Sequence, residues 1–323
     1  QGFQRGVCLA HAVGLDRGYL SAACARQLAA VRDAGADWVS LTPFAWLADP
    51  TVPEIANSTD AGPDGESDEA VCEAAARAHA LGLRVWLNPH VWTRGWAGEL
   101  AFTPRGWQRF FDGYGELALH WAIVAEREGI DGFFVGHELA SSTAAEPARW
   151  RTLIAGIRRV YAGMLSYSAN WDEVERVPFW DALDVIGVSF YAPLAERPTR
   201  DPATLRAGAT RSLALLRGVA RRFGRPVLIA ELGYAPRAEA AVRPWEETRG
   251  APDPDTQRAC YEAIVAAIEP CEWLAGAYFW KWGSAARAAG DGFDPRGRPA
   301  EAVLMAALRS WQGRPVRVPA AER

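Results

Sequence analysis

The sequence predicts a single-domain (β/α)8 barrel, and two observations lead to this fold. Eight short apolar runs, rich in β-branched and aromatic residues, recur along the 323-residue chain, and a longer stretch of helical periodicity follows each of them. The runs are continuously hydrophobic, which is typical of parallel strands that helices cover on their outer face. Eight strand and helix alternations close a barrel, and single-domain barrels reach this length.

The predicted elements alternate from one end of the chain to the other. Strands are expected at residues 4–12, 38–46, 84–92, 132–139, 163–170, 184–192, 226–234 and 274–282. Helices are expected at residues 20–34, 67–81, 104–128, 147–161, 173–183 (short), 202–222, 255–269 and 299–311. Thr103 and Asp201 each precede a proline, as N-cap residues often do. Gly35 and Gly82 lie just past helices, where a residue free to adopt positive φ ends the helix.

No linker or low-complexity stretch interrupts this alternation. We therefore expect one catalytic domain at residues 1–312 and a C-terminal tail at residues 313–323. Proline- and glycine-rich pieces at residues 48–66, 235–254 and 283–298 each follow a strand, so they are interpreted as long loops on the active-site face of a barrel. A doubly wound open sheet is the alternative fold. It requires a glycine-rich phosphate-binding turn, and the sequence contains neither GxGxxG nor a Walker loop.

Composition excludes several classes of partner and leaves the compartment open. Charged residues make up 23% of the chain and the formal net charge is −4, unlike the basic footprint of a nucleic-acid binder. The five cysteines show no zinc-site spacing, and no apolar run is long enough to span a membrane. No signal peptide precedes Gln1, but the chain lacks an initiating Met, so a leader removed earlier is compatible with the sequence. We expect a monomer without metal or organic cofactor.

Two carboxylates stand where a barrel places its chemistry. Residues at the carboxyl ends of barrel strands open onto the catalytic face, whereas residues at the amino ends serve stability. Glu138 closes the fourth predicted strand and Glu231 the seventh, each after an apolar run that would otherwise bury an uncompensated charge. Glycosidic bond cleavage needs one group that protonates the leaving oxygen and a second on the opposite face of the sugar. The alternative for each glutamate is a salt-bridged residue on the rim.

Other strand ends carry side chains suited to sugars. Indole faces can stack on the C–H faces of pyranose rings, while amide, imidazole and phenol groups bond to hydroxyls. The candidates for substrate contact are Asn88, His90, Trp92, His137, Asn170, Trp171, Tyr191, Trp280, Lys281 and Trp282. Five further tryptophans, at strand starts or on helices, are expected in the core: Trp38, Trp86, Trp121, Trp150 and Trp311.

Several segments resemble glycoside hydrolase family 113, which is known for β-1,4-mannanases and belongs to a clan of retaining (β/α)8-barrel glycosidases. They are "GADWVSLTPF", "GESDEAVCEAAARAHALGLRVWLNPHVW", "DGFFVGHEL", "SYSANWDE", "VPFWDALDVIGVSFYAPL" and "LIAELGY", in this order from the second strand onward. The resemblance implies that Glu138 is the general acid/base and Glu231 the nucleophile. It also implies that Tyr191 bonds to Glu231, and that Asn170, His90 and the tryptophans of the eighth strand line the reacting subsite.

The sequence departs from this family at two positions. His137 stands where an asparagine or a small polar residue is common, and Asn88 where a lysine is expected. The sugar therefore stays open between β-mannan, xylan, glucan and an amino-sugar polymer. A non-catalytic carbohydrate-binding barrel is the first alternative function. The second is a barrel isomerase or aldolase in which Lys281, the only lysine, forms a Schiff base.

Overall fold

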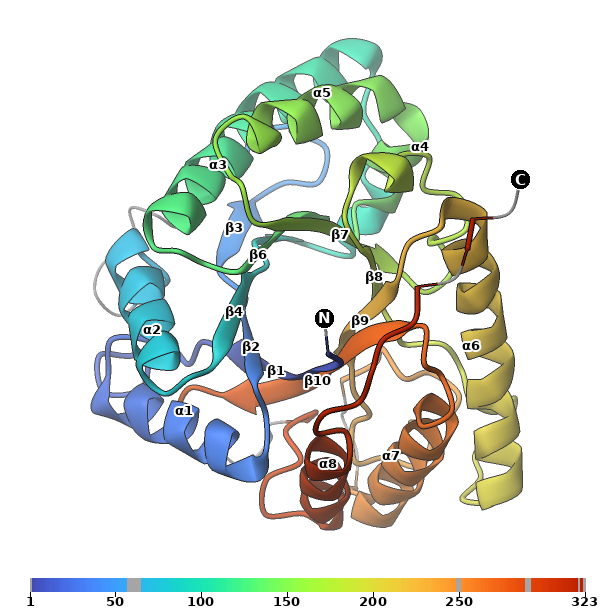
Figure 1. The fold of residues 1–323 in the computed structure, drawn as a ribbon. Coiled ribbons are helices and arrows are strands. Elements are labelled where there is room, and N and C mark those ends of the chain that lie inside the picture. The colour runs from blue at the N-terminus through green and yellow to red at the C-terminus, as the bar shows by residue number, and fades with distance from the viewer. Residues whose placement is uncertain (1, 57–64, 248–250, 288–291, 319, 322–323) are drawn as a thin grey trace.

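The computed structural model contains a closed barrel of eight parallel strands. It describes residues 2–56, 65–247, 251–287, 292–318 and 320–321. The barrel strands pair in the order β1-β10-β9-β8-β7-β6-β4-β2, and β2 closes the ring against β1 (Figure 1). Their bounds are β1 Gln4–Ala10, β2 Trp38–Leu41, β4 Arg84–Leu87, β6 Gly132–His137, β7 Met164–Asn170, β8 Ile186–Ser189, β9 Val227–Leu232 and β10 Leu274–Gly283. The predicted (β/α)8 barrel is confirmed.

Helices surround the barrel and cover its outer face (Figure 1). They are α1 Ala22–Ala34, α2 Asp68–Ala80, α3 Pro104–Arg127, α4 Ala140–Ala145, α5 Pro147–Arg158, α6 Pro202–Phe223, α7 Pro254–Ile268 and α8 Pro299–Ser310. The side chains of Thr103 and Asp201 accept hydrogen bonds from the first turns of α3 and α6, as predicted. Gly35 ends α1 with a φ of 109°.

Two predicted strands are each divided by a proline. The range 38–46 divides into β2 and β3 (Phe44–Leu47) at Pro43, and the range 84–92 into β4 and β5 (His90–Thr93) at Pro89. Proline has no N–H to donate to a ladder, so the barrel pairing ends before it. Beyond the two prolines, β3 and β5 pair in parallel as a separate two-stranded sheet. The barrel mouth is therefore extended on this side.

The predicted helix at 173–183 is wrong. The described residues between β7 and β8 form turns and one 3-10 helix, η3 (Trp180–Ala182), and Pro178 interrupts any longer helix there. The short helix α4, which follows Glu138 directly, was not predicted. In addition, β6 ends at His137 because Glu138 has a φ of 47°, which is outside the strand region. Glu138 therefore lies just beyond the end of β6 and not within it.

Aromatic side chains fill the barrel and the layer around it. Trp38, Trp86, Phe134 and Tyr278 belong to a buried cluster contributed by the barrel strands. Gln4 provides the hydrogen-bond acceptor for two of these residues: its Oε1 accepts from Trp86 Nε1 at 2.9 Å and from Tyr278 OH at 2.7 Å. All five tryptophans predicted for the core are buried. In the part of the chain that the structure describes, no helix is long and apolar enough to cross a membrane.

Candidate active site

Glu138 and Glu231 lie in one cleft at the carboxyl ends of the barrel strands. Glu138 follows β6 and Glu231 lies near the end of β9, the fourth and seventh strands of the barrel. The cleft has a volume of about 620 Å³. Its lining residues are Phe44, His90, Gly95, Trp96, Glu99, His137, Glu138, Asn170, Trp171, Asp172, Tyr191, Glu231, Trp245, Trp280 and Phe293.

Glu231 is buried and held on one side by a tyrosine. Tyr191 OH donates to its Oε2 at 2.9 Å, and His90 Nε2 lies 3.4 Å from its Oε1. Burial raises the pKa of Glu231 above its usual value, while His137 and the Tyr191 hydroxyl oppose this shift. Both neighbours stabilise the charged form of this carboxyl group.

Glu138 is half-buried and its backbone is fixed in an uncommon conformation. Its N–H donates to Ser168 O at 2.8 Å, and the next N–H, of Leu139, donates to Tyr167 OH at 2.8 Å. Trp96 Nε1 donates to Glu138 Oε2 at 2.9 Å. Burial, followed by the negative charge of Glu231, raises the pKa of Glu138 to about 8. Glu138 therefore carries a proton at neutral pH.

Two histidines form a stack beside Glu231. The rings of His90 and His137 lie 3.6 Å apart at an angle of 11°, and His137 Nε2 is 3.7 Å from Glu231 Oε1. Asn88 Nδ2 is 3.4 Å from His137 Nδ1. Burial lowers the pKa of both histidines to about 3, so both rings are neutral. With the Asn88 amide as donor, His137 keeps its own proton on Nε2 and presents it to Glu231.

The same three residues are a group that could hold a metal ion. Among the described residues, His90, His137 and Glu231 place their ligand atoms within 4.8 Å of one another. An imidazole nitrogen lone pair points within the plane of its ring. Because the two rings are stacked and almost parallel, an ion between them would lie outside both planes. The observed arrangement of the two rings therefore does not fit metal ligation.

The structure brings together part of the predicted substrate-contact set. His90, His137, Asn170, Trp171, Tyr191 and Trp280 line the cleft with the two glutamates. Asn88 is fully buried beneath His137, so it touches a cleft residue and not the cleft itself. Trp92 lies on β5, exposed and outside the cleft lining.

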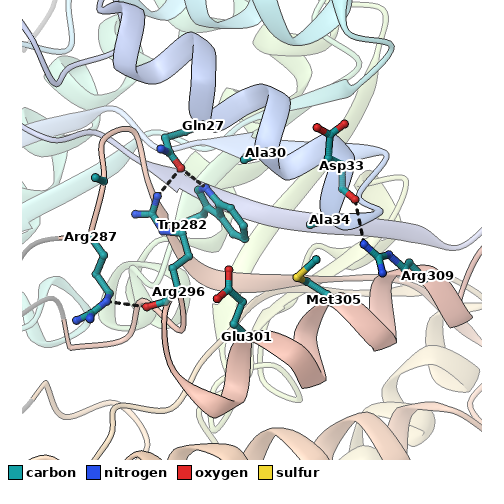
Figure 2. A pocket seen from close by; sticks show the side chains of 11 residues that line it. Gln27, Ala30, Asp33, Ala34, Trp282, Arg287, Arg296, Glu301, Met305 and Arg309 are labelled. Atoms are coloured by element: carbon teal, nitrogen blue, oxygen red, sulfur yellow. Dashed lines mark hydrogen bonds between the residues drawn. The ribbon is translucent and has the colours of Figure 1, made fainter.

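The prediction for Trp282 is corrected. This side chain is buried between α1 and α8, where its Nε1 donates to Gln27 Oε1 at 3.0 Å (Figure 2). The pairing of β10 with β1 explains the direction: Phe279 pairs with Val7 but Trp282 with Leu9, so β10 has one extra residue. An extra residue reverses the alternation of side chains beyond it. Trp282 consequently faces the outer layer of the barrel.

Lys281 also lies outside the cleft lining. Its Nζ is 3.6 Å from Glu247 Oε1, and it lines a separate hollow with Ala10 and His11. The predicted sugar contact of Lys281 does not fit this position. The Schiff-base alternative loses its support for the same reason, since the amine does not reach the pocket that holds the two carboxylates.

Several cleft residues were not predicted. Trp96 and Glu99 come from the loop after β5, and Trp245 from the loop after β9, where its ring stacks at 6.4 Å on Trp171. Phe44, Asp172 and Phe293 also line the cleft. The only sequence signal for Trp96 and Trp245 was their position in long loops that follow strands.

Two carboxyl groups with different neighbours, in a cleft lined by aromatic rings at the mouth of a (β/α)8 barrel, are the arrangement of a glycosidase. A family model described as Glycoside Hydrolase Family 113 matches residues 10–293. The chain belongs to glycoside hydrolase family 113, which confirms the predicted family and the predicted class of enzyme.

Solved structures agree with this family. The family 113 β-mannanase AaManA from Alicyclobacillus acidocaldarius, in complex with ManMIm, is 30% identical, with a TM-score of 0.85 over 96% of this chain and 98% of that chain. A complex structure of a family 113 β-1,4-mannanase is 24% identical, with a TM-score of 0.84 over 96% and 100% of the two chains. A glycoside hydrolase of subfamily 5_18 from Streptomyces cattleya, in complex with Manβ1-4GlcNAc, shares the fold at 18% identity, with a TM-score of 0.61 over 92% and 76%. A comparison with curated proteins gives no match.

Proposed function

We propose that this enzyme hydrolyses β-1,4-mannan or its oligosaccharides with retention of anomeric configuration. The observation that carries the proposal is the pair of environments around Glu138 and Glu231. Glu138 has a pKa raised to about 8 and holds a proton, whereas hydrogen bonding and a neighbouring imidazole favour the charged form of Glu231. Two carboxyl groups with separated pKa values divide the acid and the nucleophilic role between them.

In the first step the Glu231 carboxylate attacks the anomeric carbon, and the bond to the leaving oxygen breaks. Glu138 gives its proton to that oxygen, so the leaving sugar departs as a neutral alcohol. The products of this step are a glycosyl ester on Glu231 and an ionised Glu138. In the second step Glu138 takes a proton from water, the water oxygen bonds to the anomeric carbon, and Glu231 is released as carboxylate.

Similarity to a solved β-mannanase supports a mannan substrate. Two side chains nevertheless differ from those that the family resemblance leads us to expect. AaManA, at 30% identity, is a β-mannanase. The two departures noted in the sequence, Asn88 and His137, contact each other directly. His137 lines the cleft 3.7 Å from Glu231 Oε1, whereas Asn88 lies behind it and outside the cleft lining.

The test is hydrolysis of a panel of β-linked polysaccharides by wild type, Glu138→Ala and Glu231→Ala. We expect β-mannan to be cleaved by wild type, and each variant to lose about 10²-fold or more of kcat/KM. Proton NMR of the first product should show the β-anomer. Glu138→Ala should keep kcat/KM on aryl glycosides with a good leaving group, because the first step then needs no proton, but its kcat should fall because the second step lacks its base. Glu231→Ala should lose both.

Glu116→Ala is the matched control, because Glu116 is exposed on α3. It should keep full activity. Cleavage of xylan or glucan but not mannan would refute the substrate, and an α-anomeric first product would refute the double displacement. Binding of oligosaccharides without any product would favour the carbohydrate-binding alternative.

A further inference from the structure

The two-stranded sheet at the barrel mouth carries a pair of exposed tryptophans. Trp46 on β3 and Trp92 on β5 are opposite each other in the pairing register, and their ring centroids are 4.9 Å apart. The side chains are 45% and 47% exposed. Trp is usually well buried, so two adjacent half-exposed rings indicate a surface that is used for binding.

This pair continues one wall of the cleft. Phe44 and His90 are the preceding register pair, and both line the cleft. Side chains two positions apart on a strand point to the same face, about 6.6 Å further along. Trp46 and Trp92 therefore lie on the face of Phe44 and His90, one step farther from Glu231, which His90 contacts at 3.4 Å.

The opposite face of the small sheet is closed to ligands. Ala45, Leu47, Val91 and Thr93 alternate with the aromatic residues and are all buried. Hydrogen bonds also hold β3, the strand that carries Trp46, in place. Phe44 N–H donates to the buried Glu66 carboxylate at 2.9 Å, and Trp46 exchanges two backbone hydrogen bonds with Ala56. The rings are thus presented outward by a fixed support.

We infer that Trp46 and Trp92, here called the outer platform, bind further sugar units of the same β-linked chain whose scissile bond lies between Glu138 and Glu231. The inference rests on the proposed function. The platform is continuous with the cleft through Phe44 and His90, and apolar ring faces suit the C–H faces of an uncharged sugar. A substrate long enough to reach the platform gains binding that a short one lacks.

The test compares chain lengths. Wild type, Trp46→Ala, Trp92→Ala and the double variant are assayed on β-1,4-manno-oligosaccharides from the shortest that is cleaved up to the hexaose, and on an aryl β-mannoside. We expect kcat/KM on the longest substrates to fall about tenfold in each single variant. Activity on the aryl glycoside and on the shortest substrate should stay within twofold of wild type. Trp46→Phe and Trp92→Phe keep a flat ring and should retain most of the activity on long substrates.

A second readout does not depend on turnover. In native gels cast with soluble glucomannan, wild type should be retarded and the double variant should migrate almost as it does without polysaccharide. Absence of product from wild type would refute the proposed function, while the gel would still test the platform. Equal losses on short and long substrates, or none on either, would overturn the inference. If the double variant differs from wild type in its gel-filtration elution volume but is retarded equally by glucomannan, the inference is also overturned. The two tryptophans would then be assigned to contact between copies of the chain.

Discussion

At the scale of single residues, the two glutamates show how surroundings assign roles to identical side chains. Glu231 accepts from Tyr191 and faces two neutral histidines, whereas Glu138 has one indole donor and lies close to a negative charge. We expect Glu231 to lose the first proton of the pair, because His137 and the Tyr191 hydroxyl both favour its charged form. The charge that results then holds the proton on Glu138.

This order predicts a bell-shaped pH profile of kcat/KM. Activity falls at low pH, as Glu231 becomes protonated around a pKa above its usual value, and at high pH as Glu138 loses its proton around pH 8. Trp96→Phe removes a bond that stabilises charged Glu138, so the basic limb should move to higher pH while the acidic limb stays in place. Initial rates on a β-1,4-manno-oligosaccharide, whose leaving sugar needs the proton of Glu138, measure both limbs between pH 3 and pH 10.

His137→Asn is the control for the histidine stack. Since the pKa of His137 is lowered to about 3, the limbs of the profile should not originate from this ring. An additional transition near pH 6.5 in wild type that disappears in His137→Asn would show that His137 titrates, and would contradict the assignment of a neutral ring.

At the scale of elements, the packing of α6 depends on one glycine. A Cβ on Gly208 would lie 1.9 Å from the carbonyl oxygen of Leu194, so the helix can approach this loop only where no side chain intervenes. A Cβ on Gly218, in the same helix, would meet nothing within 4 Å beyond the backbone of the helix itself. The two glycines look alike in the sequence and differ only in what surrounds them.

We expect Gly208→Ala to lower the free energy of unfolding by about 2 kcal/mol or more, because backbone atoms must shift. Gly218→Ala should raise the same quantity by up to about 1 kcal/mol, since alanine is the better helix former. Urea unfolding followed by circular dichroism measures both. Equal effects in the two variants would contradict the close approach of α6 to Leu194.

At the scale of the whole molecule, the segment after α8 connects Phe3, directly before β1, with the end of α7. Phe3 N–H donates to Arg314 O at 2.9 Å, and the Arg314 guanidinium lies 4.4 Å from the Phe3 ring centroid. Arg314 Nη2 also donates to Ile268 O and Cys271 O, at 2.9 and 2.6 Å. Residues predicted as a tail thus connect β1 with the end of α7. The predicted domain boundary at residue 312 stays a prediction.

Arg314→Ala should therefore lower the free energy of unfolding by about 2 kcal/mol, through the loss of charged hydrogen bonds and a cation–π contact. Arg317 is a nearby control, because its side chain is 75% exposed in its pair with Glu272, and Arg317→Ala should change the free energy of unfolding by less than about 1 kcal/mol. Thermal melts rank the two variants. A larger loss in Arg317→Ala would refute this role of Arg314.

The sequence by itself determined the barrel, the family and the strand ends at which Glu138 and Glu231 stand. Hydrophobic runs and helix boundaries depend on neighbours along the chain, so they can be read without coordinates. The division of two strands at Pro43 and Pro89 was also encoded there, but the apolar runs continue across both prolines and concealed it.

Only the tertiary structure decided which side chains line the cleft. Trp280 lines the cleft and Trp282 packs outside the barrel, because one extra residue in β10 changes the face on which Trp282 lies. Trp96 and Trp245 enter the cleft from loops whose path depends on distant contacts. The register of β3 with β5, which no local pattern specifies, places Trp46 beside Trp92. Strand ends are a property of the chain, whereas the direction of a side chain is a property of the packing around it.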